Sequence, residues 1–95
     1  MIVRYTRRAV RDLVEIADYV HERSPRAAER VCARIEGLIS GLATFPHQGS
    51  PTDEPGIRRL VTTPFPYLIF YRVKGDTAVI LQIRHGRRRP AQLDE

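Results

Sequence analysis

The chain has 95 residues, which is enough for one hydrophobic core but not for two, so we expect a single domain over residues 1–95. Hydrophobic residues make up 42% and charged residues 28% of the sequence, a composition that excludes an intrinsically disordered chain. The net charge of +5 and the isoelectric point near 10.1 indicate a polyanionic partner, either nucleic acid or an acidic protein. Among the 16 basic residues only Lys74 is a lysine. Because the guanidinium fork of arginine suits phosphate and carboxylate equally well, composition leaves both partners open.

Two further features of the sequence indicate the cellular compartment of the protein. No apolar run reaches the length of a membrane span, and Met1-Ile2-Val3 is followed at once by Arg4, so neither a membrane-spanning segment nor a signal peptide is predicted. The single cysteine, Cys32, cannot form an internal disulfide, and it falls at an apolar helical position, as a buried thiol in a reducing compartment would. We therefore expect a cytoplasmic location.

The first half of the chain predicts one short strand and two helices. Residues 2–5 are typical of a strand, and Thr6 is placed to cap a helix over residues 7–22, whose apolar side chains recur every three or four positions. Ser24-Pro25 starts a second helix, with serine as the N-cap and proline in the first turn, and its apolar stripe continues until Phe45-Pro46. So few residues separate the two helices that they must form an antiparallel hairpin.

Gly37 and Gly41 lie inside the predicted second helix, where each costs roughly 1 kcal/mol relative to alanine. Their spacing of four residues has two interpretations. Either another backbone approaches closely at this point, or the two glycines are tolerated weak points of the helix.

The second half of the chain predicts a loop and three strands. Residues 46–56 are rich in turn-forming residues and have no apolar period. Strands are predicted over 57–63, 66–73 and 77–84, with Lys74-Gly75-Asp76 as a tight turn between the last two. The mainly apolar middle run is typical of a central strand that helices cover on one face. The fold class is therefore α+β, in the order β-α-α-β-β-β, with a helical hairpin packed on one face of a mostly antiparallel four-stranded sheet.

Five segments of the sequence together carry a resemblance to a known family. In chain order they are DLVEIADYVHERSPRAAERV, FPHQGSP, GIRRLV, PYLIFYRV and ILQIRHGRRRP. In this order and at these distances they resemble the RelE/ParE superfamily of toxins from bacterial type II toxin–antitoxin systems, and especially its ParE-like, plasmid-stabilisation branch. The resemblance implies a growth-inhibiting toxin that is neutralised by a cognate antitoxin, in a toxin–antitoxin hetero-oligomer.

The first helix offers a candidate surface for that antitoxin. In this superfamily the antitoxin's C-terminal segment folds along the toxin and commonly contacts the helical hairpin and the sheet. The first helix has more apolar positions than one narrow stripe requires, so Ile16 and Tyr19 are candidate antitoxin-binding residues in an exposed patch. The alternative is that the loop over residues 46–56 buries both side chains.

The resemblance leaves two activities open for the toxin. ParE-like members are associated with poisoning of DNA gyrase, whereas RelE-like members cleave mRNA on the ribosome. The leading hypothesis is a toxin that is not an enzyme and that binds an essential protein, DNA gyrase, through the basic C-terminal segment. The candidate target-binding residues are Arg84, His85, Arg87, Arg88 and Arg89.

The second hypothesis is a metal-free endoribonuclease. Such a reaction needs a group that accepts a proton, a group that donates one, and cations around the phosphate. Its candidate residues are His85 as acid or base, Arg58, Arg84 and Arg87 around the phosphate, and Tyr71 or Tyr67. Strand alternation, however, sends Arg84 and His85 toward opposite faces of the sheet.

Other features of the sequence weaken the nuclease hypothesis. The single lysine lies in a turn and no tyrosine follows Tyr71, whereas ribonuclease members tend to carry several strand lysines and a tyrosine near the C-terminus. His85 also has a purely structural interpretation, as a strand-end histidine hydrogen-bonded to nearby backbone. A third hypothesis is a degenerate toxin that is retained only as a partner of its antitoxin. No metal-ligand spacing and no glycine-rich phosphate loop is present, so no cofactor and no metal are expected.

Overall fold

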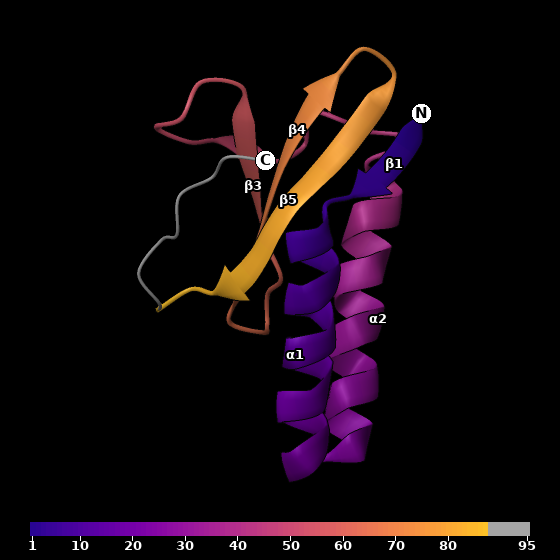
Figure 1. The fold of residues 1–95 in the computed structure, drawn as a ribbon, viewed down its shortest axis with the longest axis vertical. Helices are drawn as coiled ribbons and strands as arrows, with labels where there is room; N and C mark the ends of the chain where they lie inside the picture. Colours follow the sequence, from indigo (N-terminus) through magenta and orange to yellow (C-terminus); the bar gives the residue numbers. More distant parts are fainter. Residues whose placement is uncertain (88–95) are drawn as a thin grey trace.

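A helical hairpin packed against one face of a sheet forms the molecule, and the computed structural model describes residues 1–87 of it (Figure 1). Neither helix of this described part is long and apolar enough to cross a membrane. The predicted α+β class is confirmed. The elements in chain order are β1 (Ile2–Tyr5), α1 (Arg7–Arg23), α2 (Pro25–Gly41), β2 (Ser50–Pro51), β3 (Ile57–Val61), β4 (Tyr67–Lys74) and β5 (Thr77–His85).

Both helices begin at the predicted caps. The Thr6 side chain accepts a hydrogen bond from the Ala9 backbone N–H at 3.0 Å, and the Ser24 side chain accepts one from the Ala27 N–H at 3.1 Å. Ser24 also closes α1, because its own N–H donates to the Val20 carbonyl at 2.8 Å. One residue thus ends the first helix and starts the second, which leaves no room for any arrangement other than an antiparallel hairpin.

The end of α2 differs from the prediction. The helix ends at Gly41 and does not continue to Phe45-Pro46. The N–H groups of residues 42–44 bond to carbonyls three residues earlier, at 3.1–3.2 Å, so the last helical turn tightens after Gly41. The prediction was wrong here because the apolar stripe continues through the buried Leu42, although the backbone has already left the α-helix.

The sheet has five strands in the order β1-β5-β4-β3-β2, so the predicted central position of β4 is confirmed. Only β1 and β5 run parallel, and the other three pairs are antiparallel. The prediction of four strands was wrong by one, since β2 pairs two residues of the expected loop, Ser50 and Pro51, with Arg59 and Arg58. A two-residue strand that contains proline has no apolar pattern by which it could be recognised.

The sheet has two chemically different faces. The helix-facing side carries the main core, in which the side chains of α1 and α2 meet those of β3, β4 and β5, such as Leu60, Ile69 and Ile80. The opposite side, called here the distal face, has a smaller cluster to which neither helix contributes. It comprises the buried residues Ile57, Phe70 and Leu81 and the partly buried Leu68 and Val79. The strand register places three more residues on this face. Arg59 and Gln82 both pair with Phe70, and Arg84 pairs with Leu68.

The surroundings of Gly37 and Gly41 decide between the two interpretations of these glycines. A Cβ on Gly37 would meet nothing within 4 Å, and one on Gly41 would meet only the end of the Gln48 side chain, at 3.3 Å. Neither position is therefore a close approach between backbones. The close approach occurs at Gly49, where a Cβ would lie 2.7 Å from a ring carbon of Tyr71 and 3.0 Å from the Arg59 carbonyl.

Replacement of Gly37 by alanine is expected to raise the free energy of unfolding by about 0.5–1 kcal/mol, because alanine loses less backbone entropy in a helix and the site has room for its methyl group. Urea denaturation measures the change. Gly49→Ala is the contrasting variant and is expected to destabilise the fold. A loss of stability in Gly37→Ala would contradict the interpretation of Gly37 as a weak point of the helix.

Candidate functional site

A cavity of about 480 Å³ lies between α1 and the end of β5. Its apolar walls are Ile16, Tyr19, Pro66, Tyr67 and Ile83, and its charged or titratable groups are Arg8, Asp12, Glu15, Arg84 and His85. The candidate antitoxin-binding residues and two of the candidate target-binding residues thus line one hollow. Sequence reasoning treated them as separate surfaces, because they lie more than 60 positions apart along the chain.

His85 is the last residue of β5 and is held by two contacts. Its ring meets the Tyr67 ring edge to face, with centroids 5.7 Å apart and planes at 84°. Its Nδ1 accepts a hydrogen bond from the Arg87 backbone N–H at 3.1 Å. An accepting nitrogen carries no proton, so the neutral ring holds its proton on Nε2. In this arrangement His85 can donate from Nε2, but its acceptor nitrogen is already used by the backbone, as the structural interpretation of this histidine predicts.

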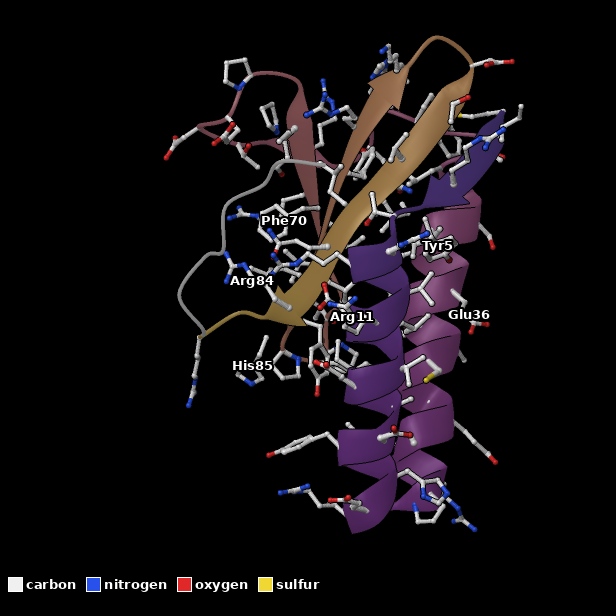
Figure 2. All side chains as sticks on the ribbon, in the orientation of Figure 1. Tyr5, Arg11, Glu36, Phe70, Arg84 and His85 are labelled. Atoms are coloured by element: carbon white, nitrogen blue, oxygen red, sulfur yellow. The ribbon has the colours of Figure 1, made fainter. Side chains whose placement is uncertain are left out.

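Arg84 points to the distal face, as alternation predicts, and Figure 2 shows it beside Phe70 on the side of β5 away from the helices. Its guanidinium carbon lies 4.9 Å from the centre of the Phe70 ring, within the range of a cation–π contact. Burial, and then the nearby charge of Arg59, lower the pKa of Arg84. The distal face therefore concentrates positive charge over an apolar floor.

Gln82 lies on the same face and is 1% exposed. Within the described residues, neither its side-chain oxygen nor its nitrogen has a hydrogen-bond partner. A buried amide without partners is unfavourable, which sets this part of the distal face apart from an ordinary packed surface. Sequence reasoning missed Arg59 and Gln82. The period of two along β3 would have placed Arg59 beside Phe70, but the irregular pairing at Leu81 breaks this period in β5 before Gln82.

The rest of the predicted target-binding segment follows directly on β5. Arg87 is exposed and lies in the turn after the strand. Arg88 and Arg89 lie outside the described residues. The structure thus places three of the five candidate residues at or next to the end of β5, with Arg84 and His85 on opposite faces.

Arg58 and Tyr71 are held elsewhere, near the middle of the sheet. The Tyr71 hydroxyl donates to the Pro46 carbonyl at 2.9 Å and accepts from the Gly49 N–H at 3.0 Å, and its ring is fully buried. Arg58 Nη1 donates to the carbonyls of Gly49 at 2.7 Å and His47 at 3.2 Å. Both side chains fasten the segment after α2 to the sheet.

The six candidate nuclease residues are therefore not gathered at one point, although Tyr67 lies against His85. Tyr71 is four residues from Tyr67, the partner of His85, which is roughly 13 Å along a strand. Arg84 faces the distal side while His85 faces the cavity. General acid–base cleavage of RNA requires the proton donor, the acceptor and the cations within hydrogen-bond reach of one phosphodiester, and this set does not offer that geometry. Within residues 1–87 no group of three His, Cys, Asp or Glu side chains is placed to hold a metal ion.

Tyr19 and Ile16, the candidate antitoxin-binding residues, differ in how exposed they are to a partner. Tyr19 is 51% exposed, so the segment after α2 does not bury it, and the guanidinium of Arg23 stacks over its ring at 3.7 Å from the centre. Ile16 is partly buried and packs against the main core. Both line the cavity, Tyr19 as an exposed rim and Ile16 as part of the floor.

A carboxylate of α1 is bound to the backbone of β5 in this cavity. Asp12 Oδ2 accepts a hydrogen bond from the Ile83 N–H at 3.0 Å and lies 3.7 Å from Arg8 Nε. The contact joins residues 71 positions apart and could not be predicted from the sequence, where Asp12 has the spacing of a solvated helix face.

The helical hairpin on one face of a five-stranded sheet defines the chain as a small α+β domain. The sequence model of the family described as "ParE toxin of type II toxin-antitoxin system, parDE" matches residues 3–90, so the chain belongs to this family, and the resemblance seen in the sequence is confirmed.

Two similar proteins and one solved structure agree with this family membership. The chain is 38% identical to the putative toxin Y4kP of Sinorhizobium fredii over 96% of this chain and 94% of that protein. It is also 38% identical to toxin RelE2 of Caulobacter vibrioides, over 88% and 93% of the two chains. A chain from the chromosomal ParDE TA system of P. aeruginosa superposes with a TM-score of 0.77 at 32% identity, covering 90% of this chain and 95% of that one. The family is thus shown, while the names of the relatives include both ParE and RelE.

Proposed function

We propose that this chain is a growth-inhibiting toxin that a cognate antitoxin neutralises, and that it acts by binding an essential target, DNA gyrase, and not by catalysis. Family membership supports the toxin and the antitoxin partner. The observation that carries the choice of mechanism is the separation of the candidate catalytic groups, since Tyr71 and Arg58 are bound internally and Arg84 and His85 face opposite sides. Either target, DNA gyrase or the ribosome, would place the toxin in the cytoplasm.

The proposed contact surface for the target is the end of β5 and the basic residues after it. Arg84, His85 and Arg87 are positioned there by the strand and its turn, and Arg88 and Arg89 extend the same run of positive charge in the sequence. Arginine and aromatic side chains are enriched among the residues that dominate protein interfaces. An acidic surface on a protein target would match this charge.

A second function, ribosome-dependent cleavage of mRNA, is favoured by one different observation. On the distal face the charge of Arg59 is close enough to contribute, after burial, to lowering the pKa of Arg84, and Phe70 lies between β3 and β5 as an apolar floor. Like charges held together on a protein surface are stabilised by an anion, and aromatic floors stack on bases. This alternative would use Arg84, His85 and Arg87, although a phosphate between Arg59 and Arg84 would lie on the distal face, whereas His85 faces the cavity.

Induction of the toxin in growing cells separates the two functions. Gyrase binding predicts inhibition of DNA supercoiling by the purified toxin in vitro, with intact transcripts in primer-extension assays. The Arg84→Gln and Arg87→Gln variants are each expected to weaken the inhibition. Cuts in codon register that disappear in His85→Ala would contradict the leading proposal. If overexpression leaves growth unaffected, both mechanisms fail and the degenerate toxin remains.

A further inference from the structure

An irregularity in β5 turns the Gln82 side chain to the distal face. Ile80 and Ile83 both belong to the main core on the helix-facing side, so the two residues between them lie on the opposite side. Phe70 pairs with Gln82 and the next residue of β4 pairs with Ile80, which leaves Leu81 as the extra residue of a β-bulge. Regular alternation would have placed Gln82 on the helix-facing side. Bulges often re-aim a side chain in this way next to a functional site.

The Gln82 amide makes no hydrogen bond that holds the fold together. Its side chain is 1% exposed, and neither its oxygen nor its nitrogen has a partner within the described part of the chain. An apolar side chain of the same shape would avoid the cost of burying an unpaired amide. A buried polar group without a partner therefore requires another explanation, and a hydrogen-bond partner on another molecule supplies one.

Two arginines flank Gln82 on the distal face. Arg59 and Gln82 pair with Phe70 from either side, so their Cα atoms lie roughly 10 Å apart across the sheet. Arg84 lies two positions further along β5, which is roughly 7 Å. The charge of Arg59 contributes, after burial, to lowering the pKa of Arg84, so the two guanidinium groups are near enough to repel one another. An anion between them would relieve that repulsion.

The strands carry no acid that could supply this anion. Within residues 1–87, none of the five strands contains an aspartate or a glutamate. Register and alternation place five basic side chains on the distal face, namely Arg4, Arg59, Arg72, Lys74 and Arg84. An acidic surface of another molecule is therefore complementary to this face.

The surroundings of Gln82 favour a protein carboxylate over a nucleic-acid phosphate. The Phe70 ring is 4% exposed and the Arg84 guanidinium carbon lies 4.9 Å from its centre, which leaves no free ring face for a base to stack on. A phosphodiester carries a sugar on either side and is too broad to follow a single side chain down to a buried amide. Val61, which is 49% exposed and pairs with Leu68, adds an apolar rim. Arginines around buried aromatic and apolar residues are typical of protein interfaces.

We propose that the distal face binds an acidic surface of the target protein, and that one carboxylate of that surface lies between Arg59 and Arg84 and accepts a hydrogen bond from Gln82 Nε2. The inference rests on the proposed function in that it takes the target to be a protein. It extends the proposed contact surface from the end of β5 to the side of the sheet away from the helices, and it adds the chemical group that is bound there.

Two arginine variants test the site by inhibition of DNA supercoiling with purified gyrase. Arg59→Gln is expected to raise the toxin concentration required for half-inhibition by about tenfold or more, because a charge-assisted hydrogen bond is lost. Arg4→Gln is the matched control. It removes the same charge from another exposed position of the distal face, beside Val79 and outside the site, and is expected to change this concentration by no more than about twofold. Equal losses in the two variants would show an effect of net charge alone and would overturn the site.

Gln82→Met separates a role in binding from a role in the fold. Methionine has a similar shape and leaves no amide unpaired, so the Tm of this variant is expected to equal or exceed that of the wild type. Inhibition of supercoiling is expected to weaken by about tenfold, as for the loss of one hydrogen bond to a charged group. A lower Tm with unchanged inhibition would show that the amide serves the fold, which overturns the proposal.

The chemical class of the occupant is tested without gyrase. The side-chain amide signals of Gln82 are followed by NMR in the full-length, ¹⁵N-labelled toxin during titration with a glutamate-rich peptide and, separately, with a single-stranded RNA oligonucleotide. These signals are expected to shift with the peptide and not with the RNA, and the shift is expected to require a higher peptide concentration in Arg59→Gln. A shift with the RNA alone would show a nucleic-acid site and would overturn the proposal.

The two sets of measurements separate this inference from the proposed function. Equal inhibition of gyrase by the wild type, Arg59→Gln and Gln82→Met overturns the carboxylate site and leaves gyrase in place as the target. A wild-type toxin that does not inhibit gyrase, but whose Gln82 amide shifts with the acidic peptide, overturns the proposed target and supports the site. The absence of both effects overturns both proposals.

Discussion

Replacement of Tyr71 by phenylalanine is expected to lower the free energy of unfolding by about 1–3 kcal/mol. The hydroxyl is the shared partner of the Pro46 carbonyl and the Gly49 N–H, and both groups lose it in the variant. Gly49 is buried, so its N–H would be left without a partner in the interior, and that costs more than the net value of one hydrogen bond. Chemical denaturation followed by circular dichroism measures the change.

Two controls make this prediction specific. Tyr19→Phe removes a hydroxyl from a half-exposed ring and is expected to leave stability within about 0.5 kcal/mol of the wild type. Tyr71→Ala also leaves a cavity beneath Gly49 and is expected to cost about 3–5 kcal/mol, enough to unfold a small protein. If folded Tyr71→Phe toxin kept its stability but lost its toxicity, the role of Tyr71 would lie in the chemistry and not in the fold.

Alkaline pH gives an independent measurement of the same side chain. Burial raises the pKa of Tyr71, and this effect outweighs the Gly49 hydrogen bond and the Arg58 charge, which lower it. Because the pKa in the folded state lies above the unfolded value of about 10, the stabilisation is complete below that pH and is lost as the pH rises through the folded value. The stability of the wild type is therefore expected to decrease more steeply above about pH 10 than that of Tyr71→Phe.

The elements that the sequence predicted are those whose causes are local. Thr6 and Ser24-Pro25 carry cap chemistry within three residues of the helices that they start, and the apolar runs of β4 and β5 are contained in the strands themselves. The opposite directions of Arg84 and His85 were also predictable, because the one irregularity in the β4–β5 pairing lies at the Phe70/Tyr71 step, before these residues. Alternation along the strand was therefore sufficient to predict side-chain directions wherever the strand was regular.

The parts that could not be predicted depend on contacts between distant residues. The place of Tyr71 in the interior follows from Pro46 and Gly49, which are 25 and 22 residues away. The sequence therefore offered Tyr71 and Arg58 as reactive groups, although their polar atoms are used to hold the segment after α2. The cavity likewise requires α1 and the end of β5 to be neighbours, and the Asp12 bond to Ile83 that joins them has no counterpart in any sequence pattern.

Replacement of Tyr19 by aspartate is expected to weaken antitoxin binding by about 30-fold or more. Tyr19 is a half-exposed aromatic residue at the rim of the cavity, and aromatic residues of this kind dominate interface energies, with a loss of about 2 kcal/mol or more on removal. The added carboxylate would also place a charge where an apolar contact is expected. Titration calorimetry with the purified antitoxin measures the affinity.

Val14→Asp is the matched control for this measurement. Val14 lies on the same helix and is 53% exposed against 51% for Tyr19, but it does not line the cavity. The two variants add the same charge to equally exposed apolar positions, so a difference in affinity reports the cavity and not the charge of the helix. Ile16→Asp is expected to weaken binding as well, but its side chain packs against the core, so its affinity is interpreted only after its folded state is confirmed.

Comparing the affinities of Tyr19→Asp and Val14→Asp also distinguishes two roles for the Tyr19 ring. The Arg23 guanidinium stacks on it at 3.7 Å, which could make the pair a feature of the helix alone. In that case Tyr19→Asp would lower helix stability by a few tenths of a kcal/mol and leave the affinity equal to that of Val14→Asp. A cavity that receives the antitoxin instead predicts a large loss for Tyr19→Asp, little change for Val14→Asp, and an intermediate loss for Arg23→Gln, because the stacked arginine holds the ring at the rim.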